Sequence, residues 1–179
     1  MAHLSPQDLL AKFQALREAA RQEPRGSADQ LKLHRELVEA CPAFTPNLLE
    51  LARLLRLADE PGVDVEEMLA EVHRLLEHAV QVSNRSADSL IELAYFLDTH
   101  RASPDEACKL LEEGASKALE SLEDAWAGLI RLHSMEGRLP QALALSAQAE
   151  KVFPESERIQ AAIADARQSA LVAGLISDS

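Results

Sequence analysis

Apolar residues recur at three- and four-residue intervals along most of the chain. This spacing places them on one side of an α-helix, so it predicts a succession of amphipathic helices. The clearest stripes are Leu9, Leu10, Phe13, Leu16 and Ala20; Leu48, Leu51, Ala52 and Leu55; Leu90, Leu93, Ala94 and Leu97; and Ile159, Ala162, Ile163 and Ala166. The pattern favours helical hairpins that bury these stripes against one another.

Helix-start signals set the expected boundaries. Ser5, Pro6 and Asp8 combine a hydroxyl N-cap, a first-turn proline and a carboxylate near the positive end of a helix. Ser27 and Gln30 have the form of a capping box. Hairpins are therefore expected at about residues 6–42, 46–84, 87–121 and 123–154, and a final capping helix at about 156–173.

The stretch from Asp124 to Pro154 carries the most specific pattern. Gly137 suits the end of its first helix and Pro140 the first turn of its second. Its landmarks lie at the offsets of a 34-residue helix-turn-helix repeat, namely Trp126, Leu129, Gly137, Ala142, Ala149 and Pro154. With these residues the stretch resembles the tetratricopeptide repeat family. The resemblance is weaker over residues 46–122 and degenerate over 6–42.

The resemblance implies an all-α fold, a right-handed superhelix of about four hairpins with a C-terminal capping helix, in a single domain over residues 1–179. In this family the first helix of each hairpin lines a concave groove. The partner-binding positions that this implies are Leu49, Arg53, Arg56, Ile91, Tyr95, Asp98, Ala127, Arg131 and Ser134. Tyr95 is expected between Arg53 and Arg131. The alternative for Arg53 is an ion pair with Glu50 on its own helix.

The charge balance bears on the kind of partner. The chain of 179 residues has a formal net charge of −12, and 47% of its residues are hydrophobic. Nucleic-acid-binding proteins need a basic surface, so this charge argues against such a partner. Because no apolar run approaches 18 residues, and because the first residues do not have the pattern of a signal peptide, we expect no membrane partner and a cytoplasmic location. The preference for Arg over Lys, with abundant Ala and Leu, suggests a bacterial source.

Candidate catalytic chemistry is sparse. His73 and His78 are five residues apart, so on a helix they point about 140° away from each other and are not expected to share a metal ion. Cys41 and Cys108 have neither metal-binding nor redox spacing. No phosphate-binding loop, nucleophile elbow or metalloprotease motif occurs. We therefore expect no enzyme activity, no metal and no cofactor.

Three functions remain open from the sequence. The first is a scaffold or adaptor that binds a peptide or helix of a partner protein in the concave groove. The second is a chaperone for a secreted protein, similar to the small acidic tetratricopeptide chaperones of type III secretion, and the third is a regulatory subunit of an enzyme complex. The apolar tail from Leu171 to Ile176 either packs on the last hairpin or joins two copies in a homodimer.

Overall fold

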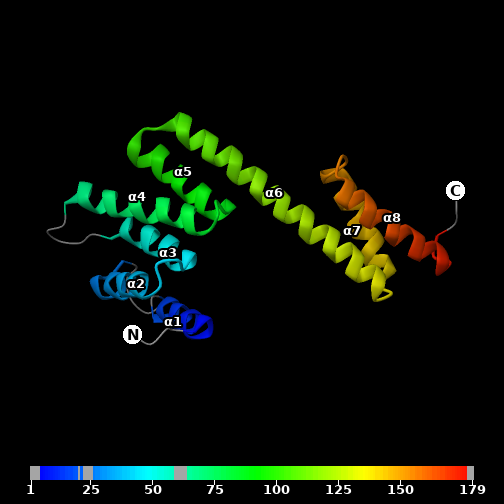
Figure 1. Cartoon of the computed structure of the whole chain (residues 1–179), viewed down its shortest axis with the longest axis horizontal. Helices are drawn as coiled ribbons and strands as arrows, with labels where there is room; N and C mark the ends of the chain where they lie inside the picture. Colours follow the sequence, from blue (N-terminus) through cyan, green and yellow to red (C-terminus); the bar gives the residue numbers. More distant parts are fainter. Residues whose placement is uncertain (1–4, 20, 22–25, 59–63, 177–179) are drawn as a thin grey trace. The chain divides into compact units, whose positions relative to one another are not determined.

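The structure is a computed structural model that describes residues 5–19, 21, 26–58 and 64–176 (Figure 1). These residues form helices and no β-strand, which confirms the all-α prediction. Residues 59–62, where the second predicted hairpin (residues 46–84) should turn, lie outside the described residues. The helices are α1 (Pro6–Ala19), α2 (Ala28–Ala40), α3 (Thr45–Leu55), α4 (Val65–Val82), α5 (Ala87–Arg101), α6 (Pro104–Met135), α7 (Leu139–Val152) and α8 (Glu157–Val172).

The chain forms two compact units. Unit 1 is Met1–Ala115 and unit 2 is Ser116–Ser179. Helix α6 begins in the first and ends in the second. The single domain expected over residues 1–179 stays a prediction.

Local capping fixes the helix starts that the sequence predicted. At α1 the Asp8 N–H donates to Ser5 Oγ (3.2 Å), and the Asp8 carboxylate accepts from the Ser5 N–H (3.1 Å) and from Ser5 Oγ (2.7 Å). The hydrogen bond from the Ser5 side chain lowers the pKa of Asp8 below its ordinary value of 3.8. At α2 the Gln30 N–H donates to Ser27 Oγ (3.3 Å). Both predicted starts are therefore confirmed.

Helix α3 is the centre of unit 1. It packs against α2, α4 and α5, and α4 also packs against α5. The predicted stripe of Leu48, Leu51, Ala52 and Leu55 is fully buried in the core of this unit. The stripe on α5 is buried in the same core. Because α3 packs against helices on more than one side, most of its apolar side chains are buried although the helix is short.

A buried polar pair joins α2 to α3. The Asn47 amide N–H donates to the carbonyl oxygen of His34 (3.0 Å), which leaves Asn47 Oδ1 to accept from His34 Nδ1 at 2.6 Å. Both side chains are fully buried, and the His34 ring lies edge-on to Phe13 at 6.3 Å. One amide thus satisfies two groups of α2 and fixes the register between the two helices.

The break expected between the sixth and seventh helices is absent. The sequence predicted one hairpin ending at residue 121 and another starting at 123, whereas α6 runs without interruption through Pro104–Met135 (Figure 1). The residues at the expected break are Leu119, Glu120, Ser121, Leu122 and Glu123, none of which is Gly or Pro. Residues of this kind continue a helix at little cost, so nothing local ends it there.

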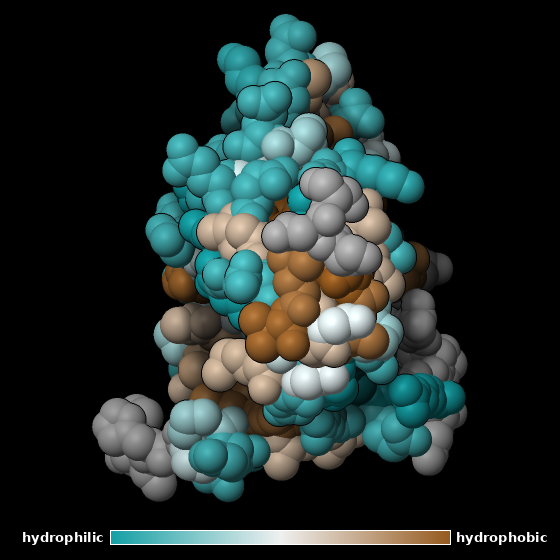
Figure 2. Space-filling model, turned by 90° about the vertical axis from the view of Figure 1, so that its right-hand side faces the viewer, coloured by the Kyte–Doolittle hydropathy of each residue, from teal (hydrophilic) through white to brown (hydrophobic). Residues whose placement is uncertain are grey.

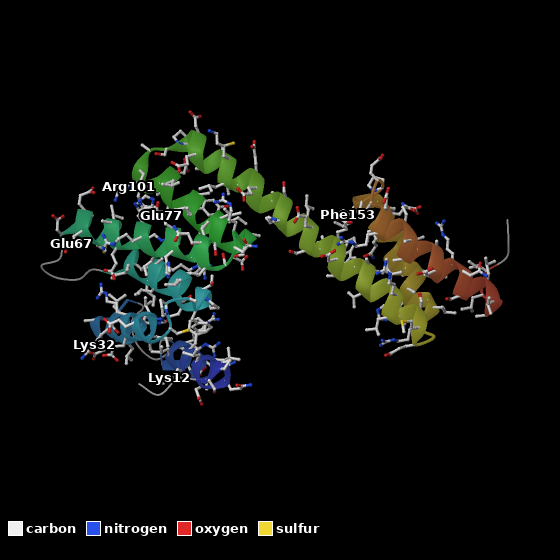
Figure 3. All side chains as sticks on the ribbon, in the orientation of Figure 1. Lys12, Lys32, Glu67, Glu77, Arg101 and Phe153 are labelled. Carbon is white, nitrogen blue, oxygen red and sulfur yellow. The ribbon has the colours of Figure 1, made fainter. Side chains whose placement is uncertain are left out.

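Unit 2 consists of the end of α6 with α7 and α8. Its core is formed by Ala127, Ile130, Ala142, Ala149, Ile159, Ala162, Ile163 and Ala166. Gly137 has φ +72°, as expected for the turn before α7. Trp126 is partly buried, edge-on to Phe153 at 5.9 Å, and Phe153 is labelled just beyond the end of α7 in Figure 3. Helix α8 packs on α7 as the predicted cap.

The buried face of α6 in unit 2 differs from the predicted one. Leu129, a landmark of the predicted repeat, is 43% exposed, whereas Ala127, expected in the partner groove, is buried. Within unit 2 the helices α7 and α8 cover the side of α6 that carries Ala127 and Ile130. Leu129 is two residues beyond Ala127, about 200° around the helix, so it cannot lie on that side.

The apolar tail keeps exposed side chains. Val172 and Leu175 are exposed, while Leu171 and Ile176 are partly buried. Figure 2 shows one face of the molecule on which hydrophobic surface is gathered among hydrophilic residues. A homodimer through this tail stays a prediction.

Candidate interaction groove in unit 1

A groove in unit 1 runs between α1 and α3 and reaches the end of α5. Its larger hollow encloses about 490 Å³ and is lined by Arg17, Glu50, Arg53, Leu54, Arg56, Leu57 and His100. A smaller hollow of about 220 Å³ shares Arg17, Glu50 and Arg53 and adds Phe13, Thr45, Pro46, Leu49, Ser86 and Asp88. These residues together are called the α1–α3 groove below.

Two arginines at the end of α3 are held by one carboxylate of α5. Arg53 Nε donates to Glu92 Oε1 (2.9 Å), and Arg56 Nη2 donates to Glu92 Oε2 (2.8 Å). Arg56 Nε also donates to the carbonyl oxygen of Ala52 (3.3 Å). Because the glutamate binds one guanidinium with each oxygen, it holds both in a defined position at the groove.

The ion pairs keep Arg53 charged. Partial burial acts to lower its pKa, but the hydrogen bond from Arg53 to Glu92 and the charges of Glu92 and Glu50 raise the pKa above its ordinary value. Glu50 Oε2 lies 3.6 Å from Arg53 Nη1, so the pairing proposed from the i, i+3 spacing is present as a weaker contact. Arg53 therefore remains a cation that is positioned by two acids.

The other end of the groove is formed by α1. The guanidinium carbon of Arg17 lies 5.7 Å from the centre of the Phe13 ring, a cation–π geometry. His100 enters the groove from the end of α5, where its ring lies 5.3 Å from that of Phe96. Its neighbour Arg101, labelled in Figure 3, donates instead to Glu66 of α4 (3.0 Å). The groove thus combines aromatic, aliphatic and cationic side chains from three helices.

Of the groove positions inferred from the family in α3 and α5, only those in α3 line this groove. Arg53 and Arg56 line the larger hollow, and Leu49 borders the smaller one although its side chain is buried. Tyr95, 55% exposed, and the exposed Asp98 lie on α5 outside both hollows. Tyr95 and Asp98 therefore belong to a separate exposed surface of α5.

Ile91 has a structural role instead. It is partly buried, and its Cγ1 atom would lie 3.1 Å from a Cβ atom added to Gly114 of α6. Ile91 therefore packs on α6 at the point where a glycine makes room for it.

The three predicted positions at the end of α6 belong to unit 2. Ala127 is buried in the core of that unit, so a partner cannot reach it, and this part of the prediction is wrong. Arg131 and Ser134 line a different hollow of about 400 Å³ with Met135, Asp165, Gln168 and Ser169. The Ser134 hydroxyl donates to the carbonyl oxygen of Ile130 (2.9 Å).

Three residues that line the groove were not predicted from the sequence: Phe13, Arg17 and His100. A local signal existed for the first two, because an aromatic and a cationic residue four apart on a helix meet on one face. No local signal existed for His100, which is brought to the groove by the packing of α5 against α3.

The histidines and cysteines singled out from the sequence lie in ordinary surroundings. His73 stacks on Phe96 at 5.4 Å, and His78 Nε2 lies 2.9 Å from the carbonyl oxygen of Pro42. Cys41 and Cys108 are free thiols. Among the described residues, no group of three or more potential ligands could hold a metal ion, and no described helix is long and apolar enough to cross a membrane.

Comparison with known proteins places the chain in a family. The profile of the Myxococcota tetratricopeptide repeat protein family matches residues 1–84, a range that contains the four helices α1, α2, α3 and α4. This chain is a tetratricopeptide repeat protein. The resemblance inferred from the sequence is thus confirmed, although residues 124–154, where it was clearest, lie outside the matched range.

A relative of this tetratricopeptide repeat protein occurs in Myxococcus xanthus. The two are 38% identical over 165 residues, which cover 92% of this chain and 95% of the relative. The relative is described as an uncharacterized 18.1 kDa protein in the carS 3′ region. The similarity extends over both units and assigns no activity to either.

Proposed function

We propose that this protein is a non-catalytic scaffold or adaptor that binds a segment of a partner protein in the α1–α3 groove. Membership of the tetratricopeptide repeat family supports a role in protein–protein interaction in general. The observation that supports this particular surface is the groove itself, in which Arg17, Arg53 and Arg56 surround apolar side chains.

The charges of the groove favour a partner segment with a carboxylate. Around the larger hollow, the guanidinium groups of Arg17, Arg53 and Arg56 are accompanied by the carboxylates of Glu50 and Glu92. This leaves a local excess of one positive charge in a chain whose net charge is −12. Arginine binds carboxylates through two parallel hydrogen bonds and contributes strongly to interfaces.

The apolar lining favours a partner segment with an aliphatic side chain beside its acid. Leu54 and Leu57 line the larger hollow, and Leu57 is exposed. The hollow has the volume of a small-molecule site, which fits a few side chains rather than a whole domain. The proposed ligand is therefore a short extended or helical segment with an acidic and an apolar residue.

Arg17→Glu tests the proposal without disturbing the pairs of Arg53 and Arg56. Proteins captured by the wild-type chain are identified by quantitative mass spectrometry, and the dissociation constant of a purified complex is then measured calorimetrically. Reversal of a charge in contact with the ligand is expected to weaken binding at least about tenfold, or about 1.4 kcal/mol. A capture of secreted, otherwise insoluble proteins would favour the chaperone alternative.

The matched control is Arg74→Glu, which reverses an exposed charge on α4, away from the groove-lining residues. It should leave the dissociation constant unchanged. Tyr95→Ala tests the separate surface on α5. Loss of binding in Tyr95→Ala with full binding in Arg17→Glu would move the site to that surface and reject the α1–α3 groove. Turnover of a substrate by the wild-type chain would reject the non-catalytic role.

A further inference from the structure

Helix α6 carries an apolar seam that is exposed in this chain. Its members recur at alternating intervals of three and four residues, the spacing of the a and d positions in a coiled coil. All six are exposed, with Leu122, Leu129 and Leu132 at 37%, 43% and 46%. The seam, called the α6 seam below, is Ala115, Ala118, Leu122, Ala125, Leu129 and Leu132.

The α6 seam extends over about 26 Å of helix, since each residue adds about 1.5 Å. Exposed apolar residues scattered singly are ordinary, whereas a contiguous stripe marks an interaction surface. Repetition of the coiled-coil interval over this length further indicates that the occupant is another helix.

Gly128 provides an independent observation on the same helix. A glycine inside a helix is less favourable than an alanine. A Cβ atom added to Gly128 would meet no atom of the described residues within 4 Å, so their packing gives no reason for the glycine. Gly128 directly precedes Leu129 of the α6 seam, where a missing side chain lets a second helix approach closely.

The order of large and small residues identifies that second helix. We infer that two copies of this chain pair through their α6 seams in an antiparallel coiled coil. Antiparallel pairing centred between Leu122 and Ala125 places each leucine opposite an alanine of the second copy: Leu122 opposite Ala125, Leu129 opposite Ala118, and Leu132 opposite Ala115. Every layer then contains one large and one small side chain, which keeps the layers equal in volume.

Other pairings of two copies lack this match. In a parallel pair, each position of the seam meets its own copy, so Leu122 faces Leu122 and Ala118 faces Ala118. Three layers would then contain two leucines and three would contain two alanines, and the alanine layers would leave voids. In the antiparallel register Ser121 also lies near Gly128 of the second copy, so two small side chains border the closest approach of the helices.

Sedimentation equilibrium of the full chain over a concentration series tests for the dimer. The single variants Leu129→Ala and Ala118→Leu change one layer to two alanines or to two leucines, and each should weaken dimerisation about tenfold or more. The double variant restores a leucine opposite an alanine in both affected layers. It should recover a dissociation constant within about threefold of the wild type.

Matched charged variants separate the α6 seam from other apolar surfaces. Leu122→Glu should abolish the dimer, whereas Val152→Glu, an equally drastic change at an exposed position of α7, should not affect it. Because Leu122 and Leu129 are exposed in the single chain, circular dichroism should show unchanged helicity in their variants.

Gly128→Leu provides a variant that acts in opposite directions on the chain and on the dimer. Leucine favours the helix, so the single chain should become no less stable, while the dimer weakens. A wild-type chain that stays monomeric at high concentration would overturn the inference. So would a dimer that survives Leu122→Glu but is lost on substitution of Val172 and Leu175 in the tail, or a failure of the double variant to recover.

Discussion

Replacement of Asn47 by alanine should strongly destabilise unit 1. The Asn47 side chain is fully buried and makes two hydrogen bonds to His34, one to the backbone carbonyl oxygen and one to the ring. Alanine at position 47 removes both hydrogen bonds, so the ring nitrogen and the carbonyl oxygen of His34 lose their partner at once. A buried polar group left without a partner costs about 1–3 kcal/mol, so the two groups together should lower the free energy of unfolding by about 2–4 kcal/mol. Such a loss is a large fraction of the stability of an ordinary domain.

Urea unfolding followed by circular dichroism measures the loss of free energy. The matched control is Gln14→Ala, at an exposed position of α1, which should change the free energy of unfolding by less than about 0.5 kcal/mol. Hydrogen exchange should locate the effect of Asn47→Ala in α2 and α3. Trp126, the single tryptophan, lies in unit 2 and reports on that unit by its fluorescence.

A second background tests the assignment of the two bonds. In His34→Leu the ring is gone, and only the backbone carbonyl oxygen loses its partner when Asn47 is replaced. Asn47→Ala should then cost about half as much as in the wild type, because side chains in one hydrogen-bonded pair are not additive. Equal costs in both backgrounds, or a loss below about 0.5 kcal/mol in the wild type, would refute the pairing described for α2 and α3.

Two further predictions concern helix ends. Because the folded chain lowers the pKa of Asp8, its cap stabilises α1 fully at pH values above the ordinary pKa of 3.8, and this stabilisation is lost as the pH falls through the lower folded pKa. Asp8→Ala should therefore reduce helicity at pH 7. Circular dichroism followed across pH should show that the difference from the wild type disappears near pH 2. Ala102 ends α5 with φ +49°, in the left-handed region, so Ala102→Gly should raise the free energy of unfolding by about 1 kcal/mol in urea; a destabilised variant would contradict this.

The sequence predicted well those features that neighbouring residues determine. The cap of α1 lies within four residues, from Ser5 to Asp8, and the buried stripe of α3 within eight, from Leu48 to Leu55. In both cases the interacting groups are brought together by the helix itself, whatever the rest of the fold does. Such features follow from spacing alone.

The groove could be predicted only in part, because it depends on distant residues. Arg53 lines this groove and was expected at a groove position from the family pattern, but its partner Glu92 lies on another helix and is oriented by the packing of α3 against α5. Tyr95 falls outside the groove because helix α5 turns another side, with His100, toward it. The sense in which a helix is rotated about its axis is set by its neighbours and is not readable from its own sequence.

The uninterrupted α6 shows what a repeat pattern alone leaves out. At the end of α5 the chain supplies Ala102 in the left-handed region followed by Pro104, and at the end of α6 it supplies Gly137, so both helices have a local reason to end. Between Leu119 and Glu123 it supplies none. A repeat offset that ignored this difference placed a turn where only helix-forming residues occur. Because α6 continues past Leu122 without a turn, the chain does not fold back on itself at this point, and Leu122 is exposed.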